Sequence, residues 1–180
     1  MAAESAYIKT NIHGSIVLAD GTGTPVTLAL AYDAGDFSID GLGEYLNEIV
    51  FLQRRGKRLS VAVGERKVPT ASLTLNVGNL IGGSNAAPGT PLEFMTKKNA
   101  YSANTSTWKT GSAPYTFKVT FTIEGTNFGD SADETVVLND CHFTGGFAEA
   151  TDGNKLSATL QVFGTIVITN STGTATYNEA

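Results

Sequence analysis

The sequence predicts a mainly β protein, an antiparallel β-sandwich or half-barrel with one short flanking α-helix in a long loop. Three observations lead to this fold class. Apolar and polar residues alternate in many short runs, which is typical of strands with one buried face. Turn-forming pairs that contain glycine separate several of these runs. One segment carries the capping residues of a helix. The chain has 180 residues, and we expect residues 1–169 to form a single β domain.

Three runs show the alternation most clearly. In residues 115–124, aromatic and β-branched apolar residues alternate with a Thr-rich polar set, and residues 72–77 and 156–162 repeat the pattern. Such residues suit a pleated surface with one buried face. Further strands are expected at residues 13–19, 26–32, 37–40, 46–53, 59–63, 135–140, 142–148 and 165–169.

Glycine-containing turns join several of these runs. Asp152-Gly153 separates the run that ends near residue 149 from the run that starts at 156, and Arg55-Gly56 connects the runs on its two sides. Asp20-Gly21 does the same with a longer loop. Glycine tolerates a positive φ, so each pair predicts an antiparallel hairpin.

The expected helix begins at Thr90-Pro91-Leu92-Glu93, which offers an N-cap hydroxyl, a proline at the first helical position and a carboxylate at the third. We expect it to span residues 91–98, with Lys97 and Lys98 in the last turn, where cations favour the helix dipole. It interrupts a long loop over about residues 78–114. Loops of this length usually have a function, so the segment is expected either to cover a sheet edge or to dock on a neighbouring subunit. Residues 170–180 are expected to be a flexible C-terminal arm.

Charge is distributed unevenly. The formal net charge is −5 and the pI about 4.9, which argues against a generic nucleic-acid binder. Two stretches without Lys or Arg, residues 20–48 and 124–152, hold most of the acids. Half of the 12 basic residues lie within residues 54–67. This pattern indicates either a solvated basic hairpin or a complementary surface that meets an acidic surface on another copy.

The second interpretation defines a candidate inter-subunit interface. Its basic members are Arg54, Arg55, Lys57, Arg58, Arg66 and Lys67. Its acidic members are Asp36, Asp40 and Glu44. Pro91 and Glu93 are added from the start of the helix.

No catalytic, cofactor or metal site is expected. The chain has one Cys and two His. Cys141 and His142 are adjacent, so in a strand their side chains point to opposite faces and form no dyad. Neither histidine has partners at a metal-binding spacing, and no glycine-rich phosphate loop is present. No apolar run approaches the roughly 20 residues that cross a bilayer, so membrane insertion is not expected. We therefore predict that the protein is not an enzyme.

The chain resembles the major tail tube proteins of long-tailed bacteriophages. The first similar feature is the motif Gly64-Glu65-Arg66-Lys67-Val68-Pro69, which leads into the expected strand at residues 72–77. Another is the run Asp140-Cys141-His142-Phe143-Thr144-Gly145-Gly146 that continues through Asp152-Gly153-Asn154-Lys155-Leu156 into Leu160-Gln161-Val162-Phe163-Gly164. The third is the single capped helix in a long loop between two groups of strands.

The resemblance implies a virion protein of the tail, assembled in the host cytoplasm. Six copies would form a ring, and stacked rings would form a tube that surrounds the tape-measure protein and later conducts DNA. Tail-terminator and tip proteins would be further partners. Thr116, Thr120 and Thr122 are candidates for the lumen, because an uncharged or acidic wall would let DNA pass without binding it. The basic residues would then face another subunit or the outside.

Two other functions remain open at this point. One is another self-assembling virion protein, such as a head-decoration or outer-tail protein. The other is a monomeric β-barrel that binds an apolar ligand among its aromatic residues, although strand aromatics are more often part of a core.

Overall fold

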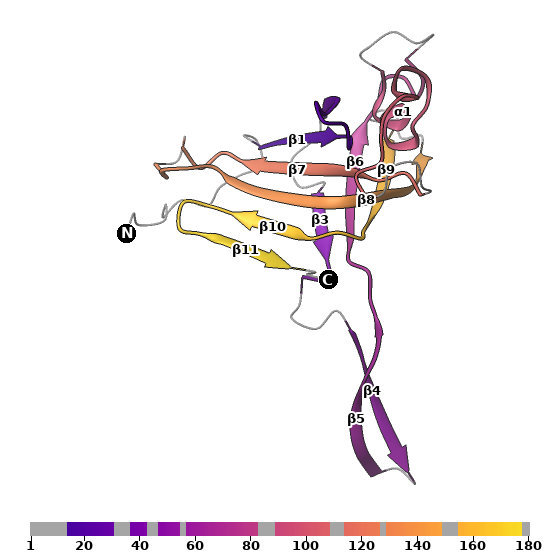
Figure 1. Cartoon of the computed structure of the whole chain (residues 1–180), viewed down its shortest axis with the longest axis vertical. Helices are drawn as coiled ribbons and strands as arrows, with labels where there is room; N and C mark the ends of the chain where they lie inside the picture. Colours follow the sequence, from indigo (N-terminus) through magenta and orange to yellow (C-terminus); the bar gives the residue numbers. More distant parts are fainter. Residues whose placement is uncertain are drawn as a thin grey trace.

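A computed structural model describes residues 14–30, 37–42, 47–54, 57–82, 89–108, 114–126, 129–148 and 155–177 (Figure 1). The fold is mainly antiparallel β-sheet with one short α-helix, which confirms the predicted class. The strands are β1 (Gly14–Ala19), β2 (Thr27–Leu30), β3 (Phe37–Asp40), β4 (Asn47–Arg54), β5 (Lys57–Arg66), β6 (Thr70–Asn76), β7 (Phe117–Ile123), β8 (Glu134–Ala148), β9 (Lys155–Val162), β10 (Ile166–Thr169) and β11 (Thr174–Tyr177). The helices are α1 (Pro91–Thr96) and the 3-10 helix η2 (Asn99–Tyr101).

The main sheet branches at the long strand β8. The strand order is β2-β1-β7-β8-β9-β6-β3, and β10 also pairs with β8 and carries β11 on its other side. The N-terminal part of β8 pairs with β7 and β10, whereas its C-terminal part pairs with β9. Asp140 lies at this change of partner and has a positive φ of 55°. In Figure 1, β3, β6 and β9 consequently run across the direction of β1, β7, β8 and β10.

The two branches face each other and enclose the core. Phe37 of β3 stacks on Phe121 of β7 with ring centroids 4.6 Å apart, although these strands are not neighbours in the sheet. Buried side chains alternate along each contributing strand, as the sequence predicts for strands with one inner face. The largest fully buried side chains are Phe94, Phe117, Ile16, Leu18, Leu73, Leu75, Leu138, Leu156, Leu160, Ile166, Val119 and Val162.

The described strands do not close into a barrel. β2 and β3 are the two ends of the strand order, and β11 ends the branch that leaves β8 through β10. The described residues therefore form an open sandwich. These strands do not form the closed barrel that the third functional alternative requires.

Helix α1 has the predicted capping box but ends earlier than expected. The Thr90 hydroxyl accepts from the Glu93 N–H, and the Glu93 carboxylate accepts from the Thr90 N–H. Lys97 adopts the left-handed conformation at φ 55°, which stops the helix at Thr96, so the prediction that Lys97 and Lys98 fall in its last turn is wrong. A left-handed residue directly after a helix is a common helix end.

Part of the long loop belongs to the core. The ring of Phe94 in α1 is fully buried and makes edge contacts with Tyr101 and Phe117, at 4.9 and 6.0 Å between ring centroids. The segment around α1 is thus packed against the sandwich of its own chain. Docking of the loop on a neighbouring subunit stays a prediction for its exposed residues.

The segment predicted to be a C-terminal arm contains a strand. Residues 174–177 form β11, which pairs with β10 from Ile166↔Tyr177 to Thr169↔Thr174. Backbone pairing, which needs no apolar side chain, is the reason that a Thr-rich segment forms a strand here. All four residues of β11 are exposed, and residues 178–180 lie outside the described part.

Candidate self-association site

The β4–β5 hairpin is a sheet of its own. β4 and β5 pair with each other and, among the described strands, with no other. Figure 1 shows the hairpin extending away from the sandwich along the long axis of the molecule. This confirms the hairpin that the sequence predicts at Arg55-Gly56, where Arg54 pairs with Lys57.

Apolar side chains are exposed on both faces of the hairpin. Phe51 is opposite Val61, and Val50 is opposite Ala62, so the two pairs lie on different faces. The exposed fractions of Phe51 and Val61 are 48% and 56%. Large exposed apolar patches of this kind usually mark an interaction surface.

The predicted basic residues lie at the two ends of this hairpin, beside its turn and at its base. Arg54 ends β4, Lys57 begins β5, and Arg58 pairs with Gln53, so three basic positions lie next to the turn. Arg66 ends β5 and Lys67, which is exposed, follows it. Arg55 lies outside the described residues.

Of the predicted acidic partners, the structure places only Asp40. It is the last residue of β3 and is exposed. Asp36 and Glu44 lie outside the described residues. β3 pairs with β6, so Asp40 belongs to the sandwich and not to the hairpin.

The free sheet edges carry few charges. Among the described strands, none pairs with the outer edges of β2, β3 and β11. The sequences of β2 and β11 are TLAL and TATY, and β3 is FSID. Monomeric proteins usually protect such edges with lysine, proline or a covering segment, because open edges pair with other chains.

The three threonines predicted for the lumen do not lie together. Thr120 and Thr122 are half-buried on the outer face of β7, in register with Val17 and Ser15 of β1. Thr116 is fully buried: its hydroxyl is 2.7 Å from the Ser106 hydroxyl and accepts from the Trp108 N–H at 3.0 Å. Thr116 is therefore left out of the candidate lumen surface.

Of the two residues predicted at the interface from the helix start, Glu93 makes its contacts inside the chain. Pro91 is the first residue of α1 and is half-buried, so its place in the interface stays a prediction. The carboxylate of Glu93 is buried, with 3% of the residue exposed, and accepts hydrogen bonds from the side chain of Asn99 and from the N–H groups of Thr90 and Gly82. These hydrogen bonds, that from Asn99 first, lower the pKa of Glu93. A carboxylate whose oxygens are used in this way supports the fold around α1 and is not part of the candidate interface.

A second buried carboxylate fixes the β1–β2 turn. Asp20 accepts from the Val26 N–H at 2.8 Å and from the Thr105 N–H at 3.0 Å. Burial alone would raise the pKa of Asp20, but its hydrogen bonds, the one from Thr105 first, outweigh burial and lower the pKa. Gly21 reinforces the contact, since a Cβ there would be 2.4 Å from the Ser106 carbonyl oxygen. The segment that leads to Trp108 is thereby held against the sandwich.

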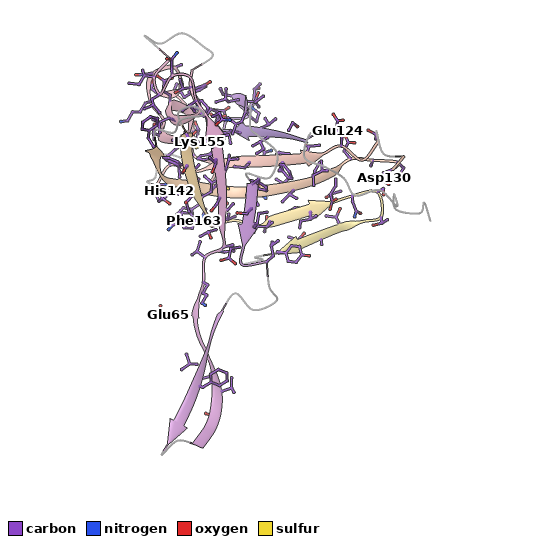
Figure 2. The ribbon with its side chains drawn as sticks, turned by 180° about the vertical axis from the view of Figure 1, so that it is seen from behind. Glu65, Glu124, Asp130, His142, Lys155 and Phe163 are labelled. Atoms are coloured by element: carbon purple, nitrogen blue, oxygen red, sulfur yellow. The ribbon has the colours of Figure 1, made fainter. Side chains whose placement is uncertain are left out.

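The sequence did not predict an aromatic strip formed by Trp108, Phe163 and His142. The Trp108 and Phe163 ring centroids are 5.7 Å apart, and those of Phe163 and His142 are 6.3 Å apart with nearly parallel planes. Figure 2 shows His142 and Phe163 close together on one side of the sandwich. The three residues are far apart in sequence, and no local pattern joins them.

Cys141 and His142 confirm the prediction of opposite faces. Cys141 is fully buried in the core, and burial raises the pKa of its thiol. The His142 side chain instead bonds through Nδ1 to the Tyr115 carbonyl oxygen at 3.0 Å, so Nδ1 is the donor.

In the part of the chain that the structure describes, no three His, Cys, Asp or Glu side chains are grouped to hold a metal ion. None of the described helices has the length and apolar character to span a membrane.

Comparison with known proteins gives structural matches only. No protein-family model matches the chain, and no curated protein matches it. Its fold is similar to a chain in the cryo-EM structure of the anti-feeding prophage baseplate, with a TM-score of 0.49 and 10% identity over 95% of this chain and 99% of that one. It is also similar to the tube-terminating cap of the anti-feeding prophage, with a TM-score of 0.48 and 12% identity over 94% of this chain and 95% of that one. A third match is a chain of the sheath-tube complex of an extracellular contractile injection system, with a TM-score of 0.46 and 12% identity over 86% of this chain and 88% of that one. Similarity of this degree assigns no function.

Proposed function

We propose that this chain is a structural subunit that assembles with copies of itself into stacked rings, forming a phage-type tail tube that conducts DNA. The observation that carries the proposal is the β4–β5 hairpin, which is paired only with itself among the described strands and exposes apolar residues on both faces. An isolated two-stranded hairpin is at best marginally stable in water. Such an arm therefore gains stability when it packs against another molecule.

The sheet edges support copies of the same chain as the partner. β2 and β11, which end the strand path β2-β1-β7-β8-β10-β11, present uncharged outer edges. Two such edges on one subunit allow head-to-tail pairing, which produces a ring when the rotation closes. Ring closure would also remove the exposed edges.

The charge distribution supports a passage for DNA. The outer face of β7 carries Thr120 and Thr122, in register with Val137 and Thr135 of β8, and Lys118 is the one charged residue on this face of the strand. With a net charge of −5 and a single lysine on this face of β7, a lumen lined by it would hold phosphates only weakly. The basic residues of the hairpin would then face a neighbouring subunit. The tape-measure, tail-terminator and tip proteins are the further partners in this proposal.

Sedimentation velocity and negative-stain electron microscopy of the purified chain over a range of concentrations test the proposal. Hollow tubes or stacked rings are expected. A monomer at every concentration would contradict self-assembly, and flat arrays without a lumen would favour the head-decoration or outer-tail alternative.

A pair of variants tests the role of the hairpin. Phe51→Ser with Val61→Ser removes the apolar pair of one hairpin face and should abolish rings while the chain remains folded. Ile81→Ser is the matched control, because Ile81 is an apolar residue with 64% exposure outside the hairpin. Equal loss of rings in both variants would show that exposed apolar area in general, and not the hairpin, drives assembly.

A further inference from the structure

The aromatic strip of Trp108, Phe163 and His142 has the features of a preformed binding surface. Its rings come from three separate segments: Trp108 follows η2, His142 lies in β8 and Phe163 follows β9. Trp108 is 46% exposed, a large fraction for the only tryptophan of the chain. Partly exposed tryptophans of this kind are frequent centres of protein interfaces.

The strip is held in place by hydrogen bonds of its backbone and rings. The backbone N–H of Trp108 donates to the Thr116 hydroxyl at 3.0 Å, and Thr116 is fully buried. His142 donates from Nδ1 to the Tyr115 carbonyl oxygen at 3.0 Å. The His142 ring and the backbone that carries the Trp108 ring are thus anchored before binding, which reduces the conformational entropy lost when a partner arrives.

One carboxylate lies beside the strip, and a second lies farther away on the same sheet. The Asp140 carboxylate lies against the backbone of Gly164, the residue after Phe163, since a Cβ on Gly164 would be 2.5 Å from Asp140 Oδ2. Across four neighbouring strands, the register aligns His142 with Gln161, then Thr70, then Asp40. At about 4.8 Å between strands, Asp40 lies about 14 Å from His142. This row contains no lysine or arginine.

An aromatic surface next to a carboxylate is suited to arginine. A guanidinium stacks on aromatic rings and at the same time forms hydrogen bonds with a carboxylate, which a lysine ammonium does less well. Arg54 and Arg58 lie beside the turn of the β4–β5 hairpin, and in Figure 1 this hairpin extends away from its own sandwich. The backbone positions of both arginines thus lie at the end of the hairpin that points away from its own sandwich.

We propose that the aromatic strip and Asp140 receive arginine side chains from the β4–β5 hairpin tip of a second copy of this chain. The inference rests on the proposed self-assembly and identifies its contact: the apolar and basic hairpin of one subunit against the aromatic and acidic face of the next. Because donor and acceptor surfaces lie on different parts of one subunit, the contact is heterologous and repeats from copy to copy.

The single tryptophan provides a direct readout in the full-length protein. Trp108 fluorescence is recorded with acrylamide quenching below and above the concentration at which rings form. Assembly should shift the Trp108 emission to shorter wavelength and reduce quenching, because the indole side chain becomes covered. Subunit rings that form with unchanged emission and quenching would overturn the inference and leave the proposed self-assembly intact. A wild-type chain that never assembles would refute both.

Matched variants separate stacking from charge. Trp108→Ala should raise the lowest protein concentration at which subunit rings form by about tenfold. Trp108→Phe keeps an aromatic side chain and should raise this concentration by less than about threefold. Replacing Arg54 and Arg58 together by Lys keeps the charge but loses the planar group, and should resemble Trp108→Ala. If both changes leave ring formation unaltered in chains with wild-type urea unfolding, the inference is wrong.

Two further measurements exclude other roles of the strip. Asp140→Asn removes the charge but keeps a residue that tolerates a positive φ, and it should also raise the concentration needed for rings. Single-stranded DNA added to the unassembled chain at physiological salt should leave Trp108 fluorescence unchanged. A saturable change on adding DNA would assign the strip to nucleic acid and overturn the proposal.

Discussion

The sandwich and the β4–β5 hairpin are both antiparallel β-structure, but they place their apolar residues differently. In the sandwich, buried and exposed positions alternate along β6, β7 and β9, and Phe94 of α1 is fully buried between Tyr101 and Phe117. In the hairpin, Phe51 and Val61 face each other at the surface. The sandwich provides its own core, whereas the hairpin has none in the described part of a single chain.

This difference separates stability from assembly. Regions with many buried apolar contacts unfold only with the whole domain, whereas regions with few such contacts open locally. Substitutions in the sandwich should therefore change the free energy of unfolding, and substitutions in the hairpin should change association. Three predictions test this division.

The largest effect is expected for Phe94→Ala. Removing a fully buried ring leaves a cavity beside Tyr101 and Phe117, which should lower the free energy of unfolding by about 3–5 kcal/mol. Urea unfolding followed by circular dichroism measures this. A loss below about 1 kcal/mol would mean that α1 is only loosely attached and that the sandwich is less distinct from the hairpin than we infer.

A smaller effect that depends on pH is expected for Glu93→Gln. The amide keeps the shape of the cap but loses the charged acceptor, so stability at pH 7 should fall by about 1–2 kcal/mol. The folded-state pKa of Glu93 is lowered, so its contribution is present above the ordinary glutamate pKa and is lost as the pH falls through the folded value. Urea midpoints of both proteins should converge on acidification. If the difference between the two urea midpoints stayed constant from pH 7 down to a pH at which glutamate is protonated, the effect would come from the geometry of the cap and not from its charge.

The smallest effect on stability is expected for Phe51→Ser. The side chain is 48% exposed on a hairpin outside the core, so the free energy of unfolding of the monomer should change by less than about 0.5 kcal/mol. The same urea titration, at a concentration below ring formation, provides the value. A loss comparable to that of Phe94→Ala would show that the hairpin packs on its own sandwich in solution.

The strands and hairpins could be predicted from sequence because their signals are local. Alternation in residues 72–77 and 156–162 and the pair Asp20-Gly21 depend on neighbours in the chain, and so does the capping box of Thr90 and Glu93. The basic block between Arg54 and Lys67 could likewise be assigned to a hairpin.

Contacts between distant segments could not be predicted in this way. Thr116 continues the alternation of β7, but tertiary hydrogen bonds with Ser106 and Trp108 bury it and remove it from the surface. Lys97 ends α1 through a left-handed conformation that helix propensity does not show. The aromatic strip depends on the branch at β8, which brings His142 next to Phe163, and a single sequence gives no signal for such a branch.

The link between β5 and β6 has a mechanical consequence. Three residues separate the hairpin from β6, and the Val162 N–H donates to the Pro69 carbonyl oxygen at 2.9 Å in this link. β6 pairs with β9 over its full length, from Thr70↔Gln161 to Asn76↔Lys155. Tension applied to the hairpin is therefore directed along β6 and loads all the hydrogen bonds of the β6–β9 ladder in parallel, as shear, because these bonds lie perpendicular to the strands. A subunit pulled by its arm would resist as a whole ladder rather than open one bond at a time.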